Sequence, residues 1–108
     1  MIFKLLSRDQ FRQSVFTRDN DKCLVCQKPA VDAHHILDRK LWTDGGYYLE
    51  NGASLCESCH LEAESTVISC SKLRELAKIT KYPIPEHLYI DQVYDNWGNI
   101  LLPNGTRL

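Results

Sequence analysis

The fold of this chain is decided by two cysteine pairs, Cys23-Leu-Val-Cys26 and Cys56-Glu-Ser-Cys59, which are separated by residues 27–55. A two-residue spacer lets a tight turn direct both sulfurs of a pair at one ion, at Zn–S distances of about 2.3 Å. Two such pairs predict one tetrahedral site with four thiolate ligands, and thiolates suit a closed structural zinc. The sequence therefore predicts a structural Zn²⁺ bound by Cys23, Cys26, Cys56 and Cys59.

A second group of polar side chains lies between and beside these pairs. It consists of Asp32-Ala-His34-His35-Ile36, then Asn51-Gly52, and then His60 directly after the last cysteine. Imidazole beside carboxylate suits an open metal site that takes part in chemistry, in contrast to a closed site of four sulfurs. The sequence thus predicts a zinc-built scaffold that carries a second, working metal.

Length and composition set the limits of this interpretation. The chain has 108 residues, 44% of them hydrophobic and 25% charged, which is typical of one soluble globular domain. It contains no apolar run of membrane-spanning length, and Met1-Ile-Phe-Lys-Leu-Leu is too short for a signal peptide. Without an export signal, paired C-x-x-C motifs favour metal binding over disulfides and indicate a cytoplasmic protein. The fifth cysteine, Cys70, is expected to be a buried small hydrophobe.

The charge is distributed unevenly along the chain. Residues 1–40 hold eight Lys and Arg against five acids, or +3, and residues 41–108 hold five against nine, or −4. The total of −1 is not typical of a strongly basic nucleic-acid binder. The first part could form a phosphate-facing surface, but a solvated mixed-charge surface explains the same numbers.

Local patterns predict a helix, two strands and two further helices. Ser7 and Gln10 have the spacing of a capping box, and Phe11, Val15 and Phe16 follow at helical spacing. The expected elements in chain order are a helix at 8–18, a strand at 31–37, a loop at 39–46, a brief extended segment at 47–49, a turn at Asn51-Gly52, a strand at 53–55, and helices at 57–66 and 71–78.

The last part of the chain has a different composition. Prolines and turn signals predict an extended arm at 81–108, beyond a domain at 1–80 whose motif core is 23–64. The aromatic residues of the arm could stack on bases, anchor the arm on its own domain, or contact a second subunit. These aromatic residues are Tyr82, Tyr89, Tyr94 and Trp97. The fourth histidine, His87, is expected at the surface of a loop.

The order and spacing of these motifs resemble the HNH nucleases, also called ββα-metal or treble-clef nucleases, over residues 11–64. The resemblance implies a small α+β, zinc-stapled ββα-metal (treble-clef) domain with flanking helices and an extended C-terminal arm. It also implies a metal-dependent endonuclease that hydrolyses phosphodiester bonds in double-stranded DNA, with Mg²⁺ or Mn²⁺ as the working ion. Residues 1–80 would form the nuclease domain, and residues 81–108 would pack on it or bind a partner.

The same resemblance assigns expected roles to individual residues. His35 occupies the position of the general base, and Asn51 that of the residue which orients the base and its loop. His34 and His60 occupy positions of catalytic metal ligands. Glu64 lies one helical turn after His60, so it is expected either as a third ligand or as an exposed carboxylate.

Several alternatives remain open at this point. The scaffold could be a non-catalytic zinc-binding module for nucleic acid or protein, with His34 and His35 as ordinary strand residues. His60 could replace a cysteine at the zinc, and Asn51 could be only a turn residue. Residues 61–64 (Leu-Glu-Ala-Glu) stand where many HNH nucleases have Lys or Arg, which would weaken non-specific DNA affinity. A homodimer, a partner protein, or an RNA or hybrid substrate therefore also remains open.

Overall fold

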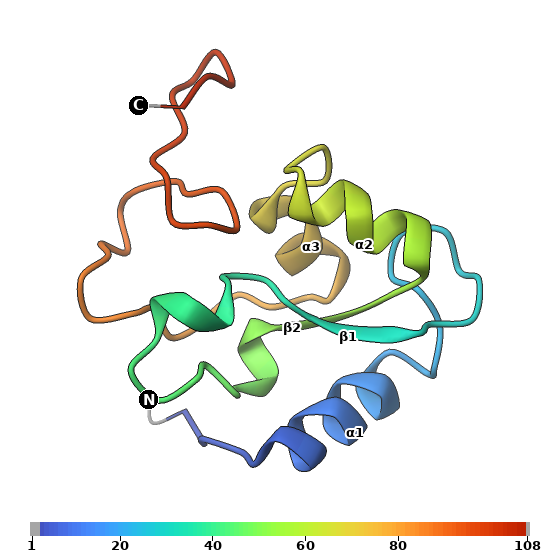
Figure 1. The fold of residues 1–108 in the computed structure, drawn as a ribbon. Helices are drawn as coiled ribbons and strands as arrows, with labels where there is room; N and C mark the ends of the chain where they lie inside the picture. The colour runs from blue at the N-terminus through green and yellow to red at the C-terminus, as the bar shows by residue number, and fades with distance from the viewer. Residues whose placement is uncertain (1–2, 108) are drawn as a thin grey trace.

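The computed structural model describes residues 3–107. A two-stranded antiparallel sheet lies between helix α1 on one side and helices α2 and α3 on the other (Figure 1). This arrangement confirms the expected small α+β fold, which is compatible with a zinc-bound ββα domain. The elements are α1 (Arg8–Arg18), β1 (Asp32–His35), the 3₁₀ turns η1 (Arg39–Leu41) and η2 (Leu49–Asn51), β2 (Gly52–Leu55), α2 (Glu57–Glu64) and α3 (Cys70–Leu76). None of the helices within residues 3–107 has the length and apolar character that crossing a membrane requires.

Helix α1 begins with the expected capping box. The Gln10 backbone N–H donates to Ser7 Oγ at 3.2 Å, and the Ser7 backbone N–H donates to Gln10 Oε1 at 3.0 Å. These two bonds satisfy N–H groups that would otherwise lack a partner in the first turn. Phe11 and Val15 form the buried face of α1, so the predicted helix at 8–18 is confirmed.

Strand β1 is shorter than predicted because Asn51 interrupts the ladder. Asp32 pairs with Leu55 and His35 pairs with Gly52, but the next backbone N–H, that of Ile36, donates to the Asn51 carbonyl at 2.8 Å. The predicted extended segment at 47–49 is wrong in part, because Leu49–Asn51 forms a 3₁₀ turn. The predicted loop at 39–46 likewise contains the short turn η1.

The helices after the sheet begin or end a residue or two away from their predicted limits. Helix α2 ends at Glu64 because Ser65 caps it and Thr66 turns back with a φ of 62°. Helix α3 begins one residue earlier than predicted, since the Ser69 hydroxyl accepts a hydrogen bond from Lys72 N at 3.0 Å.

Gly52 has a different role from the turn that the Asn51-Gly52 pair predicts. Its φ of −120° is ordinary extended backbone and does not require glycine. A Cβ placed there would lie 2.3 Å from Val15 Cγ2 and 3.0 Å from the Phe11 ring. Glycine is therefore needed because helix α1 packs directly on the start of β2.

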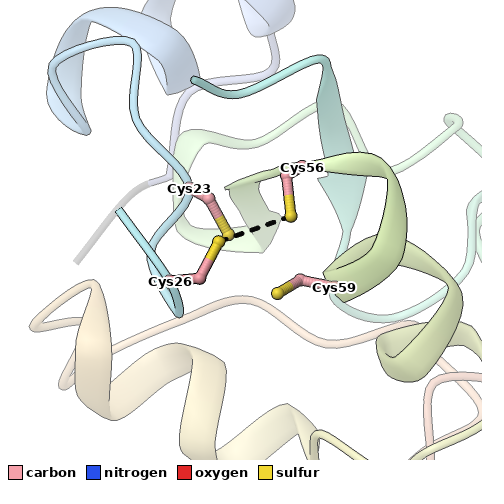
Figure 2. Close-up of side chains that lie close together, drawn as sticks. All are labelled: Cys23, Cys26, Cys56 and Cys59. Atoms are coloured by element: carbon pink, nitrogen blue, oxygen red, sulfur yellow. Dashed lines mark hydrogen bonds between the residues drawn. The ribbon is translucent and has the colours of Figure 1, made fainter. Parts of the chain in front are cut away.

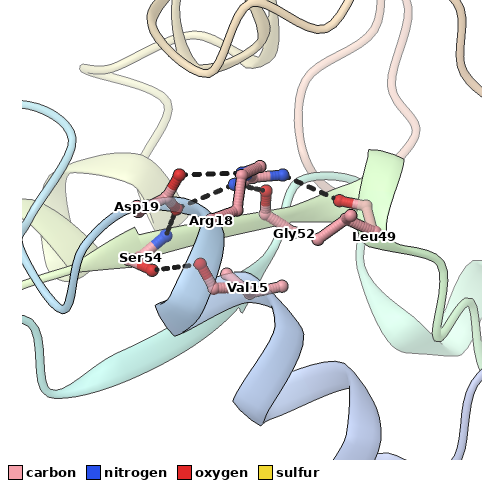
Figure 3. A network of polar contacts seen from close by, with 6 residues as sticks. All are labelled: Val15, Arg18, Asp19, Leu49, Gly52 and Ser54. Atoms are coloured by element: carbon pink, nitrogen blue, oxygen red, sulfur yellow. Dashed lines mark hydrogen bonds and ion pairs between the residues drawn. The ribbon is translucent and has the colours of Figure 1, made fainter.

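An ion pair at the end of α1 holds the helix against this strand (Figure 3). Arg18 bonds Asp19 through Nε and Nη2, and it donates to the Leu49 and Gly52 carbonyls at 2.9 and 2.7 Å. The Ser54 backbone N–H donates to Asp19 Oδ2 at 3.0 Å. The two carbonyls bound by Arg18 lie on either side of Asn51 in the chain, so this network fixes the backbone that presents Asn51.

Cys70 is buried, as expected for a cysteine outside the two pairs. It is 3% exposed and its thiol donates to the Ile36 carbonyl at 3.2 Å. It packs in the core with Leu37, Leu55 and Leu73, which ties α3 to the sheet.

The arm folds back on itself and on the domain. Isolated bridges join Tyr94 to Ile100 and Leu101 to Arg107, so the arm is turned rather than extended. The Asp38 backbone N–H donates to the Asn96 carbonyl at 2.7 Å, which joins the arm to the loop after β1. Tyr94 is buried, His87 is exposed as expected, and Trp97 is 45% exposed.

Replacing Asp95 is expected to loosen the arm. Its carboxylate is fully buried and accepts hydrogen bonds from Trp97 N, from Asn99 N and Nδ2, and from Arg107 Nε. We expect Asp95→Ala to lower the free energy of unfolding by about 1–3 kcal/mol, because it leaves these donors unpaired. The exposed Asp91 of the same arm provides the control, and Asp91→Ala should change stability by less than about 0.5 kcal/mol.

The pH dependence of unfolding gives the same prediction an independent check. Burial raises the pKa of Asp95, but the hydrogen bonds from Arg107, Asn99 and Trp97 outweigh it and hold that pKa below the ordinary 3.8. A depressed carboxyl pKa stabilises the fold at pH values above 3.8 and loses this effect as the pH falls through the folded value. Thermal unfolding should therefore separate the parent from Asp95→Ala most at neutral pH. An equal melting temperature for the two proteins at neutral pH would contradict this role of Asp95.

Candidate active site

The four paired cysteines converge on one point between the turn after α1 and the start of α2 (Figure 2). Their sulfurs all lie within 4.8 Å of one another, and Cys26 Sγ is 3.5 Å from Cys56 Sγ. A zinc tetrahedron with bonds of about 2.3 Å has sulfur–sulfur edges of about 3.8 Å. All four are free thiols. The donor set and its spacing therefore fit a structural zinc ion.

The backbone around each pair explains this convergence. The Cys23 N–H donates to the Lys28 carbonyl at 2.7 Å and the Gln27 N–H donates to the Cys23 carbonyl at 3.0 Å, which closes a tight turn. Cys56 is the N-cap residue of α2 and Cys59 lies in its first turn. Hydrogen bonds from the Ser58 hydroxyl, 3.5 Å from Cys56 Sγ, and from the Cys59 backbone outweigh burial and lower the pKa of the Cys56 thiol to about 6, which favours the thiolate form that binds metal.

A pocket of about 590 Å³ runs around the free edge of β1. Helices α1 and α2 line it from opposite faces of the sheet, and η1 and the arm, which the bond from Asp38 N to the Asn96 carbonyl joins, complete it. It is lined by the expected active-site residues His34, His35, His60 and Glu64, and also by Asp32, Arg39 and Trp97. The structure therefore brings the predicted residues of the second group to one place, apart from Asn51, which lies behind them.

His34 and His60 lie next to each other across the gap between β1 and α2. Their ring centroids are 5.0 Å apart. His34 Nε2 is buried and has no hydrogen-bond partner among residues 3–107. Burial lowers the pKa of His34 to about 3, with a smaller contribution from His60, so the ring is neutral and keeps a free lone pair. A buried nitrogen without a partner costs about 1–3 kcal/mol, which a bound cation would offset.

Two carboxylates lie within 3.2 Å of the ring nitrogens of His60. Its Nε2 lies 3.2 Å from Glu64 Oε1, one helical turn away, and its Nδ1 lies 3.0 Å from Asp32 Oδ2. Imidazole, carboxylate and an orphaned imidazole nitrogen form a donor set that fits a divalent cation. Among the described residues, however, only the four cysteine sulfurs lie close enough together to hold a metal ion as they stand, and the ring nitrogens and carboxylates of the second group do not form such a cluster.

Asp32 is a site residue to which the sequence analysis assigned no role. Asp32 and His34 are two residues apart in a strand, so both side chains point to the same face. This two-residue spacing is visible in the sequence and could have placed Asp32 beside His34. A carboxylate on Nδ1 fixes the tautomer of a metal-binding histidine and leaves Nε2 free for the metal.

His35 points to the other face of β1, toward α1. Its ring packs on Phe11 and Tyr47, with centroids 4.6 and 5.1 Å away. Its Nε2 is 3.1 Å from the Gly45 carbonyl, which can only accept, so Nε2 carries the proton and Nδ1 keeps its lone pair. Burial lowers the pKa of His35, against a smaller opposing effect of the Gly45 bond. The ring is therefore neutral at pH 7.

Asn51 holds the loop that carries Gly45. Its Nδ2 donates to the carbonyls of Leu37 and Gly46 at 3.1 and 3.2 Å, and its Oδ1 accepts from Leu37 N at 3.0 Å. It is 2% exposed. These bonds connect both ends of the loop 37–46, which fixes the carbonyl that His35 contacts.

The geometry of these residues agrees with a comparison of the chain with known protein families. Residues 23–66 match the HNH endonuclease family. This HNH segment contains both cysteine pairs and the whole second group of polar residues, which confirms the resemblance found in the sequence. No curated protein and no solved structure gives a significant match. Helix α1 and the arm lie outside the HNH segment, although both line the pocket.

Proposed function

We propose that this protein is a metal-dependent endonuclease that hydrolyses phosphodiester bonds, with double-stranded DNA as its substrate. The match to HNH endonucleases supports action on nucleic acid. The observation that carries the proposal is that two adjacent histidines of β1 have different environments, one suited to bind a metal and the other to accept a proton. His34 has a buried nitrogen that finds no partner within the part of the chain that the structure describes, and His35 is neutral with a fixed tautomer.

His35 would act as the general base. Its Nδ1 takes a proton from the attacking water while Nε2–H stays on the Gly45 carbonyl, so the ring is held in place as it becomes charged. A positioned base of this kind contributes about 10²- to 10⁴-fold to the rate. Asn51 would act as a positioning residue, because it holds the loop but does not line the pocket.

His34, His60 and Glu64 would hold a divalent cation. When bound, such an ion stabilises negative charge on phosphoryl and leaving oxygens. The mixed donor set admits Mg²⁺ or Mn²⁺, which the family resemblance favours, and also Ni²⁺ or Zn²⁺. Asp32 orients His60, and Arg39 and His35 line the same pocket.

A second candidate is a non-catalytic interaction module on the same scaffold. The observation that favours it is the sequence of α2, Glu57–Glu64, which has three glutamates and no lysine or arginine. Such a helix repels phosphate and would bind nucleic acid weakly. A module of this kind needs its zinc but has no use for a neutral histidine held by a carbonyl.

The proposal is tested by plasmid cleavage with and without divalent metal. We expect the zinc-loaded protein to nick or linearise supercoiled plasmid in Mg²⁺ or Mn²⁺, and to be inactive in buffer stripped of divalent ions. Metal analysis and circular dichroism should show that the stripped protein keeps its zinc and fold, and returning Mg²⁺ should restore cleavage. A folded, zinc-loaded protein that cleaves no DNA or RNA substrate with any of these ions would contradict the proposal and favour the interaction module.

A further inference from the structure

The arm places an indole at the edge of the active-site pocket. Trp97 Nε1 donates to the Glu64 carbonyl at 2.8 Å, at the end of the helix that carries His60. The Trp97 backbone N–H donates to the buried Asp95 carboxylate at 2.9 Å. Trp97 is thus held at its ring edge and at its backbone, yet 45% of its surface is exposed. A fixed, exposed aromatic face beside a reaction centre is an available stacking surface.

The neighbouring turn residue reinforces this placement. Asn96 accepts the Asp38 backbone N–H through its carbonyl at 2.7 Å, and its Oδ1 accepts the Thr66 hydroxyl at 3.1 Å. Asn96 is 3% exposed and lines the same pocket. The arm is therefore attached to both the loop after β1 and the end of α2, so the indole has a defined position relative to His34 and His60.

The charged residues of the pocket are unevenly distributed. Helix α1 and turn η1 contribute three exposed arginines, and within residues 3–107 none of them forms an ion pair. These are Arg8, Arg12 and Arg39. Asp9 and Asp38 also line the pocket, so these three arginines and two aspartates sum to +1. Strand β1 and helix α2 contribute Asp32 and Glu64, which would orient His60 and hold the cation, and none of their residues that line the pocket is a lysine or arginine.

This uneven distribution favours one phosphate backbone at the pocket. The arginines attract a phosphodiester strand, whereas α2 presents the proposed cation to the scissile phosphate and no basic side chain to a second backbone. A regular duplex would bring its second backbone toward α2 and would keep its bases stacked in the helix, where the indole cannot reach their faces. A base can lie on Trp97 only if its nucleotide has left the stack.

We infer that the pocket selects a DNA strand with an unpaired nucleotide at the cleavage site. Its phosphates lie along Arg8, Arg12 and Arg39, and its unpaired base stacks on Trp97. Trp97 is then a specificity-determining residue that lies outside the HNH segment. The inference rests on the proposed action on DNA, and it narrows the substrate from duplex DNA in general to bulged, mismatched, frayed or single-stranded sites.

Binding and cleavage of three labelled oligodeoxynucleotides test this inference. They share one sequence and are a perfect duplex, the same duplex with a single-nucleotide bulge, and the single strand. Binding is measured by fluorescence anisotropy with His35→Ala protein, so that affinity is read independently of turnover. Cleavage is measured with protein that retains His35. We expect both affinity and cleavage to favour the bulged and single-stranded oligonucleotides.

Two substitutions at Trp97 isolate the aromatic face. Trp97→Phe and Trp97→Leu both lose the bond to the Glu64 carbonyl, but only Phe keeps an aromatic face. We expect Leu to weaken binding of the bulged and single-stranded DNA by about 5- to 150-fold, since stacking contributes about 1–3 kcal/mol per base and 1.4 kcal/mol is tenfold. Phe should retain most of the affinity. Tyr89→Ala, an exposed aromatic residue of the arm away from this pocket, should have no effect.

The outcomes separate this inference from the proposed function. Equal affinity of the Phe and Leu variants for bulged DNA, or a parent that binds and cleaves the perfect duplex as well as the bulged one, would overturn the role of Trp97 while leaving the nuclease intact. A parent that cleaves none of the three but prefers unpaired DNA through Trp97 would support the binding inference and reject the nuclease.

Discussion

His35→Ala is expected to reduce plasmid cleavage by about 10²- to 10⁴-fold or to abolish it, while the protein keeps its zinc and its fold. The reason is the position of this ring. His35 is half-buried on Phe11 and Tyr47, and its proton-bearing nitrogen is bound to the Gly45 carbonyl. Removing the ring deletes the free Nδ1 lone pair without touching the four cysteines. Cleavage rates should be measured beside zinc content and thermal unfolding.

A second histidine substitution provides the matched control for this prediction. His87 is exposed in the arm and does not line the pocket, so His87→Ala should cleave like the parent. The ring of His35 also contributes packing, and its loss can lower the melting temperature by several degrees without unfolding the protein. A folded His35→Ala protein with parental cleavage would show that another group takes the proton from water, and the assignment of the base would be wrong.

The sequence predicted the metal scaffold and the three histidines of the pocket for a physical reason. The spacing of the cysteine pairs and of the three histidines is local. Because these residues lie on a strand and a helix of regular geometry, their spacing determines which way each side chain points. Asp32 shows the limit of this reasoning. Its alternation with His34 was visible, but its contact with His60 depends on how α2 packs against β1.

Contacts between distant segments could not be predicted in the same way. The Arg18–Asp19 network depends on the end of α1 meeting η2 and β2, which no local pattern records. The same is true of Gly52, whose missing side chain makes room for Val15. Trp97 reaches the pocket because the buried carboxylate of Asp95 folds the arm back, and composition alone indicated only an extended segment.

The second large effect is expected at the zinc site. Cys56→Ala should lose zinc and unfold, because binding a structural zinc supplies about 10–16 kcal/mol that the unfolded chain does not gain. This is comparable to or larger than the whole free energy of unfolding of an ordinary small domain, about 5–15 kcal/mol. Metal analysis should find no bound zinc, and circular dichroism should show loss of helix.

Cys70 provides a control that shows whether the effect is specific to the zinc ligands. Cys70 is also buried, but it lies outside the cluster of sulfurs and donates to the Ile36 carbonyl. Cys70→Ala removes a small buried group and should cost about 1 kcal/mol, with zinc content unchanged. If Cys56→Ala binds zinc and melts as the parent does, then the four sulfurs do not form a structural zinc site.

Loss of zinc should also remove activity, through a route that differs from the loss of His35. Cys56 caps α2, Cys59 lies in its first turn, and His60 follows directly, so the same helix connects the sulfur cluster to the pocket. Without the ion, α2 is no longer held beside β1, and His60 moves away from Asp32 and His34. Cys56→Ala should therefore be inactive and unfolded, whereas His35→Ala should be inactive and folded. Measuring cleavage, zinc content and unfolding on both variants distinguishes the scaffold from the chemistry that it supports.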